Sequence, residues 1–354
     1  MNHFDYKALP WNLIFGTDSL QRLPEELDKL GFSRALVLTT PNQTRDGEAI
    51  TELLGNRAVG LFDQAVMHVP AATVEQAIAE VERLKADCTV SLGGGSTTGL
   101  GKALALKLDL PNIVIPTTYA GSEMTNIWGI TDQGRKVTGR DNKVLPTLTI
   151  YDPKLTLSLP AKFAGPSGLN AMAQAVVNVT SGTLNPIVAN MALAAVRALS
   201  RSLPKVVADP NDLDARAEAL YGACLAGGSL GTGVTSLHHR LCHIFGGSFN
   251  TPHAETHTIL LPHCVAYNAS STAEGTQQLA QALSVEDPAL GLFELAQAVD
   301  APTTLKEIGI KEDDLDKAAQ IATETPVNNP EPVTTARVRQ LLENAFHGHP
   351  PTPV

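Results

Sequence analysis

Histidines form the part of this sequence most suggestive of chemistry. Six of the ten lie between His238 and His263, in the stretch SLHHRLCHIFGGSFNTPHAETHTILLPHC. His239 and His243 are four residues apart and share one helix face, and His253 follows a glycine turn. Imidazoles in such a cluster can hold a metal ion, or they can donate a proton and bind an anion near neutral pH. Both kinds of site stay open at this point.

A second polar pair lies on a helix expected over residues 167–177, SGLNAMAQAVV. Asn170 and Gln174 are four residues apart, so both amides project from one helix face. Neutral amide oxygens are weak ligands for Fe²⁺ or Zn²⁺, whereas an amide group can both donate and accept hydrogen bonds. We therefore take both residues as candidates for substrate binding.

A glycine-rich segment in the first half, SLGGGSTTGLGKALAL (91–106), indicates a strand that turns into a helix. Glycines there let backbone N–H groups approach a pyrophosphate, and the helix N-terminus favours negative charge. The usual dinucleotide fingerprint would need glycine where Thr98 stands, so a merely tight strand–helix turn is the alternative. The candidates for cofactor binding are Gly94, Gly95, Ser96 and Thr97.

Two further loops follow strands and should meet the glycine turn at the same edge of the sheet. PTTYAGSEMT (116–125) offers Thr117, Thr118 and Ser122 for a cofactor and Tyr119 for a substrate. TTPNQT (39–44) offers Thr40 and Asn42 where an acidic residue could have held both ribose hydroxyls. Without that acid, a 2′-phosphate is rejected weakly, and either NADH or NADPH is the expected cofactor.

Composition limits the range of partners. The chain has 354 residues, 43% of them hydrophobic, and a formal net charge of −10. This charge argues against nucleic acid or an anionic membrane as the main partner, because both need clustered Lys and Arg. The four cysteines form no C-x-x-C pair and no apolar run is long enough to span a bilayer. We expect a cytoplasmic protein that acts on a small molecule.

The positions of these motifs imply an α/β half followed by an all-helical half. Short β-branched runs alternate with helical patterns such as 73–86 in the first half, which predicts a parallel sheet covered on both faces. The expected strands are 35–40, 58–63, 88–95, 112–118 and 147–153. After about residue 155 the pattern becomes helical, with a hinge expected within 155–168. The expected domains are a dinucleotide-binding domain, 1–157, and an all-helical catalytic domain, 158–354.

Taken together, these motifs resemble the iron-containing alcohol dehydrogenase family. The resemblance rests on H-x-x-x-H followed ten residues later by H in HHRLCHIFGGSFNTPH, on the GGGS loop and on the PTT loop. It implies the dehydroquinate synthase-like fold, an α/β dinucleotide-binding domain followed by an all-helical domain, and frequently a homodimer. Within the family the chain is similar to the maleylacetate reductase branch, through GRKVTGRD, LPTLTIYDPKLTLSLP and NNPEPVTTARVRQLLENAF among other stretches.

The resemblance also bears on a metal. In the metal-dependent members, the helix matching 168–178 carries an Asp and, four residues later, a His, which join two later histidines around the ion. Asn170 and Gln174 stand in the first two positions here, and His239 and His253 in the others. Since no carboxylate offsets the charge of an ion, we expect no metal. Gly99, where the alcohol dehydrogenases have Asp, is again similar to the maleylacetate reductase branch.

The branch implies reduction of the carbon–carbon double bond of maleylacetate, a 2-enoic 4-oxo diacid, to 3-oxoadipate with NADH or NADPH in the catabolism of aromatic compounds. Hydride addition beside a ketone develops an enolate, which hydrogen-bond donors can stabilise. His243 and His253 are the candidates for polarising the ketone and protonating carbon, with His239 in support. The basic candidates for the dicarboxylate are Lys136, which is also a cofactor candidate, Arg140, Lys143 and Arg240; the alternative for each is a solvated surface position.

One departure from the branch keeps other activities open. Maleylacetate reductases typically read NAxAHxxE where this chain reads NAMAQAVV, so Gln174 replaces a His and Val177 a Glu. The first interpretation is a reductase that uses only His239, His243 and His253. The second is a non-redox enzyme on the same scaffold, such as a hydrolase, a decarboxylase or a cyclase. The third is a catalytically silent subunit.

Overall fold

The computed structural model describes residues 3–132, 135–182 and 185–354. They form two compact units, one of Leu9–Leu159 and one of the residues up to Ala8 together with Pro160–Val354. The first residues therefore group with the helical unit, where the Asn185 side-chain amide donates to the Asp5 carbonyl at 3.0 Å. The sequence-based limits had placed them in the other domain. That the two units are independently folding domains stays a prediction.

The first unit is built on a six-stranded sheet in which every neighbouring pair is parallel. In spatial order the strands are β1 (Leu13–Phe15), β8 (Leu148–Tyr151), β5 (Asn112–Pro116), β4 (Cys88–Gly93), β2 (Ala35–Leu38) and β3 (Ala58–Phe62). The parallel sheet predicted from the alternating pattern is confirmed, and five of these strands lie in expected segments. β1 was not expected, because three residues carry too little pattern to identify a strand.

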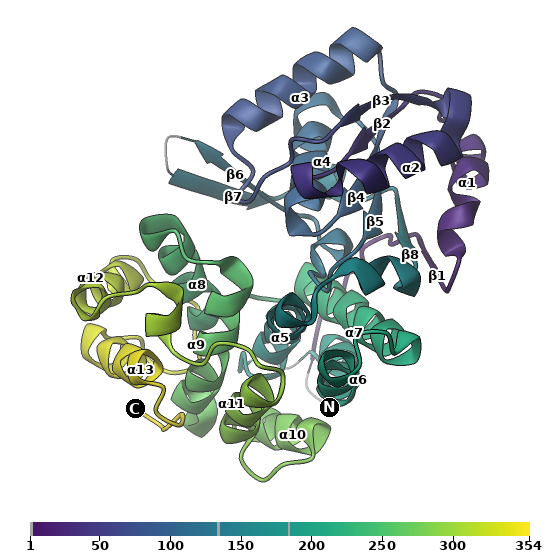
Figure 1. Cartoon of the computed structure of the whole chain (residues 1–354). Coiled ribbons are helices and arrows are strands. Elements are labelled where there is room, and N and C mark those ends of the chain that lie inside the picture. The colour runs from purple at the N-terminus through teal and green to yellow at the C-terminus, as the bar shows by residue number, and fades with distance from the viewer. Residues whose placement is uncertain (1–2, 133–134, 183–184) are drawn as a thin grey trace. The chain divides into compact units, whose positions relative to one another are not determined.

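Side chains alternate across this sheet, and each face packs against its own pair of helices (Figure 1). Val37 and Val90 lie in a core with Leu27 and Ile50, whereas Leu38 lies in a second core with Leu104. Both faces are therefore buried, as parallel sheets require. The helices are α1 (Leu23–Leu30) and α2 (Thr44–Leu54) on one face and α3 (Ala71–Leu84) and α4 (Gly95–Leu108) on the other.

A separate antiparallel hairpin, β6 (Ile127–Asp132) and β7 (Arg135–Arg140), lies beside the loop that follows β3. The Thr131 N–H donates to the Val69 carbonyl at 3.0 Å, and the Thr131 hydroxyl donates to the His68 carbonyl at 2.8 Å. The sequence analysis did not predict this hairpin. It places Lys136, directly opposite Thr131, next to the 68–69 backbone.

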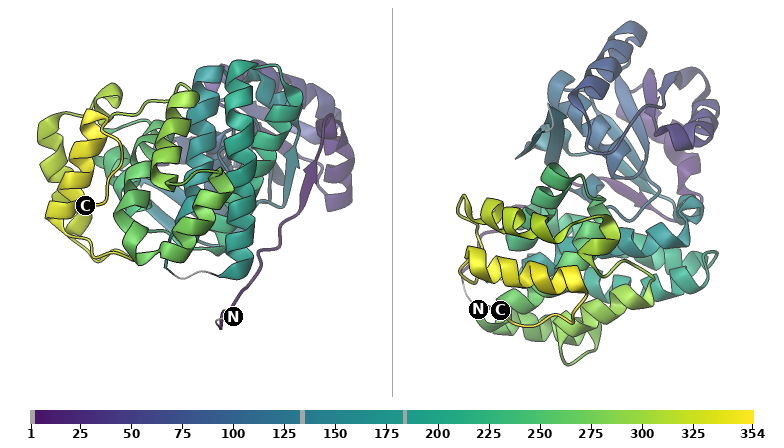
Figure 2. Two further views of the ribbon diagram at one scale, coloured as in Figure 1. Left: turned by 90° about the horizontal axis from the view of Figure 1, so that it is seen from below. Right: turned by 60° about the vertical axis from the view of Figure 1, so that its left-hand side comes forward.

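The described part of the second unit contains only helices as regular structure, which confirms the all-helical prediction (Figure 2). α5 packs against α6, α7 and α9, α8 packs against α9, and α12 runs beside α13. The helices are α5 (Ala161–Val179), α6 (Pro186–Ala208), α7 (Leu213–Thr232), α8 (Leu237–Phe249), α9 (His253–Asn268), α10 (Ala273–Leu283), α11 (Pro288–Ala298), α12 (Glu312–Thr323) and α13 (Thr335–His347).

Part of the expected hinge is helical. Residues 161–168, which we had assigned to a hinge within 155–168, form the first half of α5, and Pro166 lies inside that helix. Proline at this position removes one backbone hydrogen bond near the helix start, and burial of almost every following side chain offsets that loss. The helix that carries Asn170 and Gln174 is therefore longer than 167–177.

In the described parts of the chain, no helix is both long and apolar enough to cross a membrane. The four cysteines, Cys88, Cys224, Cys242 and Cys264, are all free and buried.

The stability of the helical unit should fall in mild acid because buried histidines must gain a proton. Burial lowers the pKa of His263 to about 4 from 6.5, with a smaller effect of His349. Between pH 4 and pH 6.5 the folded protein thus binds fewer protons than the unfolded chain. The part of the unfolding free energy that depends on His263 is therefore fully present above pH 6.5 and is lost as the pH falls toward 4. We expect His263→Phe to reduce the loss of unfolding free energy between pH 7 and pH 5 by about 2 kcal/mol, as measured by urea unfolding. An unchanged pH dependence would contradict this.

Candidate active site

The glycine turn between β4 and α4 is shaped for close approach of a ligand. Gly93 has φ +146°, and a Cβ there would lie 2.6 Å from Thr97 Oγ1. A Cβ on Gly94 would lie 2.9 Å from the Thr118 side chain, whereas one on Gly95 would meet only Ala120 Cβ, at 4.0 Å. No side chain caps the first turn of α4, so its N–H groups are available to an anion. Thr97 is fully buried, and its side chain lies against the glycine turn at Gly93, so the contact predicted between Thr97 and a cofactor stays a prediction.

Gln43 joins the loops that follow β2 and β5 at this edge of the sheet. Its side-chain amide donates to Thr117 Oγ1 at 3.1 Å, and its carbonyl oxygen accepts from Thr40 Oγ1 at 3.4 Å. The Thr117 N–H in turn donates to the Gly93 carbonyl at 3.0 Å. The loops after β2, β4 and β5 are thereby held together, as predicted for Thr40 and Thr117. Asn42 is exposed beside them, and Gln43 itself was missed.

A buried lysine fixes the loop that follows β5. Lys102, 1% exposed on α4, donates to the carbonyls of Ser122 at 2.6 Å, Thr125 at 2.8 Å and Ile127 at 2.9 Å. Burial lowers the pKa of Lys102 to about 7, and the nearby Glu123 carboxylate acts in the opposite direction. Ser122, predicted to contact the cofactor, therefore has its carbonyl engaged by Lys102. A single lysine within the apolar run GLGKALAL was the signal that could have identified this residue.

Burial raises the pKa of Glu123, next to this lysine, and Tyr151 donates its hydroxyl to Glu123 Oε1 at 2.9 Å. Tyr119, a predicted substrate contact, is fully buried in the same unit. Its contact with a substrate stays a prediction.

The hairpin presents a cation beside the loop after β3. Burial lowers the pKa of Lys136. Among the described residues, Lys136 forms no ion pair with an acidic side chain. The pKa of His68 is lowered mainly by the burial of His68 itself and, to a smaller extent, by the positive charge of Lys136. Val69 reaches toward the start of α4, where a Cβ on Gly99 would lie 2.7 Å from Val69 Cγ2. An aspartate at position 99 would collide with Val69, which explains why glycine stands there.

The other basic candidates are engaged elsewhere. Lys143 pairs with Asp109 at 3.3 Å, at the C-terminal end of α4 and thus about 20 Å from its glycine turn. Arg240 donates to Thr325 Oγ1 at 2.6 Å and to the Ile321 carbonyl at 3.3 Å, so it ties α8 to the end of α12. Arg140 contacts Asn126 Oδ1 at 3.4 Å. The structure therefore favours Lys136 over Lys143 and Arg240 for an anionic ligand.

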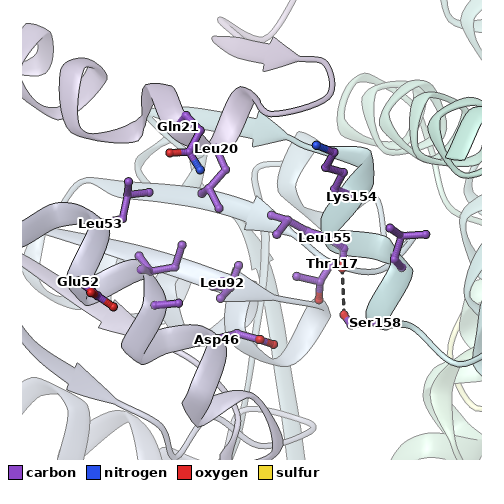
Figure 3. Close-up of a pocket in the computed structure, with 13 residues that line it drawn as sticks. Leu20, Gln21, Asp46, Glu52, Leu53, Leu92, Thr117, Lys154, Leu155 and Ser158 are labelled. Atoms are coloured by element: carbon purple, nitrogen blue, oxygen red, sulfur yellow. Dashed lines mark hydrogen bonds between the residues drawn. The ribbon is translucent and has the colours of Figure 1, made fainter.

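A pocket of about 620 Å³ opens on the α1/α2 face of the sheet next to Thr117 (Figure 3). Leu20, Leu53, Leu92 and Leu155 make most of its wall apolar. Asp46 and Glu52 contribute carboxylates to the lining, and Lys154 is already paired with Asp18 at 2.7 Å. An uncharged planar group suits this lining better than a phosphate does.

In the helical unit, α5 presents buried, uncharged polar groups. Asn170 is 6% exposed and its Oδ1 has no hydrogen-bond partner, and Gln174 is 7% exposed. Val177, where the related branch has Glu, is buried. One turn on, Asn178 donates to the Gln174 carbonyl and accepts from the Val234 N–H, both at 2.9 Å, which holds the segment before α8 against α5.

The structure brings the histidines of α8 and α9 into one cluster. The ring centroids of His238 and His257 are 4.8 Å apart, those of His239 and His257 are 5.4 Å apart, and those of His253 and His257 are 4.4 Å apart. His257 thus lies at the centre, although only His239, His243 and His253 were predicted as site residues. The spacing of His257, four residues after His253, was the signal for it.

Burial separates these histidines into two kinds. It lowers the pKa of His238 to about 4 and that of His257 well below its ordinary value, to which the neighbouring imidazoles also contribute. Both rings are therefore neutral at pH 7. His243 is exposed and His253 is half-buried at the start of α9, so these two rings are accessible from outside the cluster.

The residues at the four positions that hold a metal in the resembled family do not fit one. Asn170 and Gln174 contribute amides and His239 and His253 contribute imidazoles, so this set lacks a carboxylate. Fe²⁺ and Zn²⁺ bind amide oxygens weakly. Asn170 Oδ1 is buried and has no hydrogen-bond partner among the described residues.

Family models match both units of the chain. The model described as iron-containing alcohol dehydrogenase matches residues 10–153, and that of the C-terminal part of the Fe-containing alcohol dehydrogenase family matches residues 165–346. A maleylacetate reductase from Sphingobium indicum is 52% identical over 98% of this chain and 99% of its own, and one from Burkholderia cepacia is 47% identical over 99% and 100%. The crystal structure of a maleylacetate reductase from Agrobacterium tumefaciens, 46% identical, superposes with a TM-score of 0.95 over 99% of this chain and 100% of that one.

Replacing Lys102 should disorder the loop that it holds. Lys102→Met leaves three carbonyls without their donor, which costs about 2 kcal/mol or more in unfolding free energy, and we expect weaker binding of a dinucleotide as well. Chemical unfolding and a fluorescence titration with NADH measure the two effects. Lys107→Met, on the exposed side of the same helix, is the control and should change neither.

Proposed function

The chain belongs to the iron-containing alcohol dehydrogenase family and is an oxidoreductase, and we propose that it reduces the carbon–carbon double bond of maleylacetate to 3-oxoadipate with NADH or NADPH. The observation that carries this proposal is the identity of 42–52% with maleylacetate reductases over nearly the whole chain. The non-redox alternative is not favoured, because these relatives are named as reductases and the glycine turn for a dinucleotide is present.

The first unit binds the cofactor in this proposal. The pyrophosphate lies on the N–H groups at the start of α4, where Gly94, Gly95 and Ser96 leave room for it. The adenine lies in the apolar pocket beside Thr117, and Lys136 meets a ribose or an anionic group. Thr40 and Asn42, at the end of β2, add no negative charge at their own positions, so both NADH and NADPH are accepted.

In the chemical step, a hydride adds to the double-bond carbon farther from the ketone, and the electron pair of the double bond moves onto the ketone oxygen as an enolate. A proton then adds to the carbon next to the ketone. The sum is maleylacetate, NAD(P)H and one proton giving 3-oxoadipate and NAD(P)⁺. Hydrogen-bond donors, here imidazole N–H groups and the amides of Asn170 and Gln174, stabilise the enolate.

His243 and His253 are the proposed proton donors, and His239 supports them. A general acid must carry its proton near the working pH, which excludes His238 and His257 because burial depresses their pKa values. His243 is exposed and His253 is half-buried, so both side chains are accessible to a substrate and to solvent. No step passes through a metal. A cytoplasmic homodimer that serves the catabolism of aromatic compounds completes the proposal.

The primary test is the loss of absorbance at 340 nm when protein treated with EDTA meets maleylacetate and NADH or NADPH. Rapid oxidation that resists the chelator is expected. We also expect His243→Gln and His253→Gln to lower kcat by about 10²- to 10⁴-fold, whereas His347→Gln on exposed α13 keeps the wild-type rate. Oxidation that needs added metal would refute the metal-free mechanism, and the absence of any oxidation would refute the reductase.

Lys136 and Lys143 form a matched pair for testing the proposed cation. We expect Lys136→Ala to raise the KM for cofactor or substrate by about tenfold, equivalent to about 1.4 kcal/mol, with a smaller effect at high ionic strength. Lys143→Ala removes only an exposed ion pair with Asp109 and should leave both constants unchanged. Equal effects of the two substitutions would show that the hairpin lysine has no specific role.

A further inference from the structure

Three buried histidines lie together in a geometry that the proposed reduction does not use. His238, His239 and His257 each offer a ring nitrogen, and the three nitrogens all lie within 4.8 Å of one another. All three side chains are buried, at 3%, 6% and 2% exposure. His239 also belongs to the proposed reaction site, but His238 and His257 have no part in it.

Two of these rings have nitrogen atoms without a hydrogen-bond partner in the described part of the protein. Neither ring nitrogen of His257 has a hydrogen-bond partner, and Nδ1 of His238 has none. A buried imidazole without partners is costly, so such groups in a folded protein call for an explanation. A ligand that accepts electron pairs from several imidazoles at once provides one.

The hydrogen bond of His238 selects its tautomer. His238 Nε2 lies 3.2 Å from the His257 carbonyl oxygen, so Nε2 carries the hydrogen and donates it. Nδ1 then keeps its lone pair. A histidine that donates its other N–H to a backbone carbonyl is the arrangement that orients most metal-binding imidazoles.

The spacing of the rings matches a tetrahedral ion. With a Zn–N bond of about 2.05 Å, each ring centroid lies about 3.2 Å from the ion, and tetrahedral angles separate the centroids by about 5.2 Å. The three pairs here are 5.3, 4.8 and 5.4 Å apart, with the planes 78–84° from one another. Small rotations of the three side chains would therefore let one nitrogen of each ring bind the same ion.

From this geometry we propose that His238, His239 and His257 form a binding site for a late first-row divalent cation, with Zn²⁺ as the ion that suits three imidazoles best. The site differs from the family's set of four positions, since it shares only His239 with them. Three protein ligands leave a fourth position for water or an anionic oxygen. Because the ligands come from α8 and α9, a bound ion cross-links these two helices.

The test uses full-length protein without an affinity tag, stripped with a chelator and titrated with Zn²⁺ against a chromophoric chelator, with neither cofactor nor substrate present. We expect uptake of one equivalent, and a loss of affinity of at least about 100-fold in His257→Phe and in His238→Phe. The matched control is His347→Phe. It removes the second possible cluster, the surface group Glu312, Glu343 and His347, and should bind like the wild type.

Cobalt makes the test independent of whether the variants fold. Co²⁺ added to the wild-type protein should give the intense visible absorption of a tetrahedral site, and thermal unfolding should shift upward with Zn²⁺ concentration. Absence of tight uptake by the wild type, a weak octahedral spectrum, or loss of binding in His347→Phe but not in His257→Phe would each overturn the proposal. None of these readouts depends on reductase activity. Failure of the metal-site proposal therefore leaves the proposed function unaffected, and failure of the proposed function leaves the metal-site proposal unaffected.

Discussion

The chemistry of the helical unit depends on one constraint, which is that the buried polar side chains described on α5, α8 and α9 are uncharged amides, hydroxyls and imidazoles. Asn170, Gln174 and Val177 occupy the face of α5 where acids would change the charge of the cluster. Without such acids, burial keeps His238 and His257 neutral. In the proposed reaction, the enolate would therefore meet hydrogen-bond donors and imidazoles and no buried carboxylate of these helices.

The first unit obeys a different constraint, the close approach of three loops at the carboxyl edge of a parallel sheet. A side chain at position 94 would collide with Thr118, so only glycine fits there. Gln43 bridges two of the loops by hydrogen bonds. Lys102 holds the segment from Ser122 to Ile127 in place, because its single ammonium group donates hydrogen bonds to three backbone carbonyls there. A buried ammonium is tolerated only where such acceptors surround it.

Local pattern was enough to predict the sheet, its helices and the glycine turn, because both faces of a parallel sheet must be apolar and a tight turn must be glycine. It was not enough for the β6/β7 hairpin or for the helical residues 161–168, where tertiary contacts outweigh local propensity. Residue type pointed to His239, His243, His253 and Thr117. The residues that hold these loops, Gln43 and Lys102, lie within the same motifs, but the groups they contact, Thr117 and the carbonyls of 122–127, lie elsewhere in the sequence, and residue spacing does not record those contacts.

The same limit applies to the histidines, where the decisive property is depth. The segments HHRLCH and PHAETH contain five histidines that the sequence alone does not distinguish. In the fold, these histidines differ in their exposure to water. His243 is exposed and His253 is half-buried, so both are accessible to solvent, as the proposed proton donors must be. His238, His239 and His257 are buried and lie together, as the ligands of the proposed ion must. In the two proposals, depth in the fold therefore assigns proton transfer to the rim of the cluster and a bound ion to its centre, with His239 common to both.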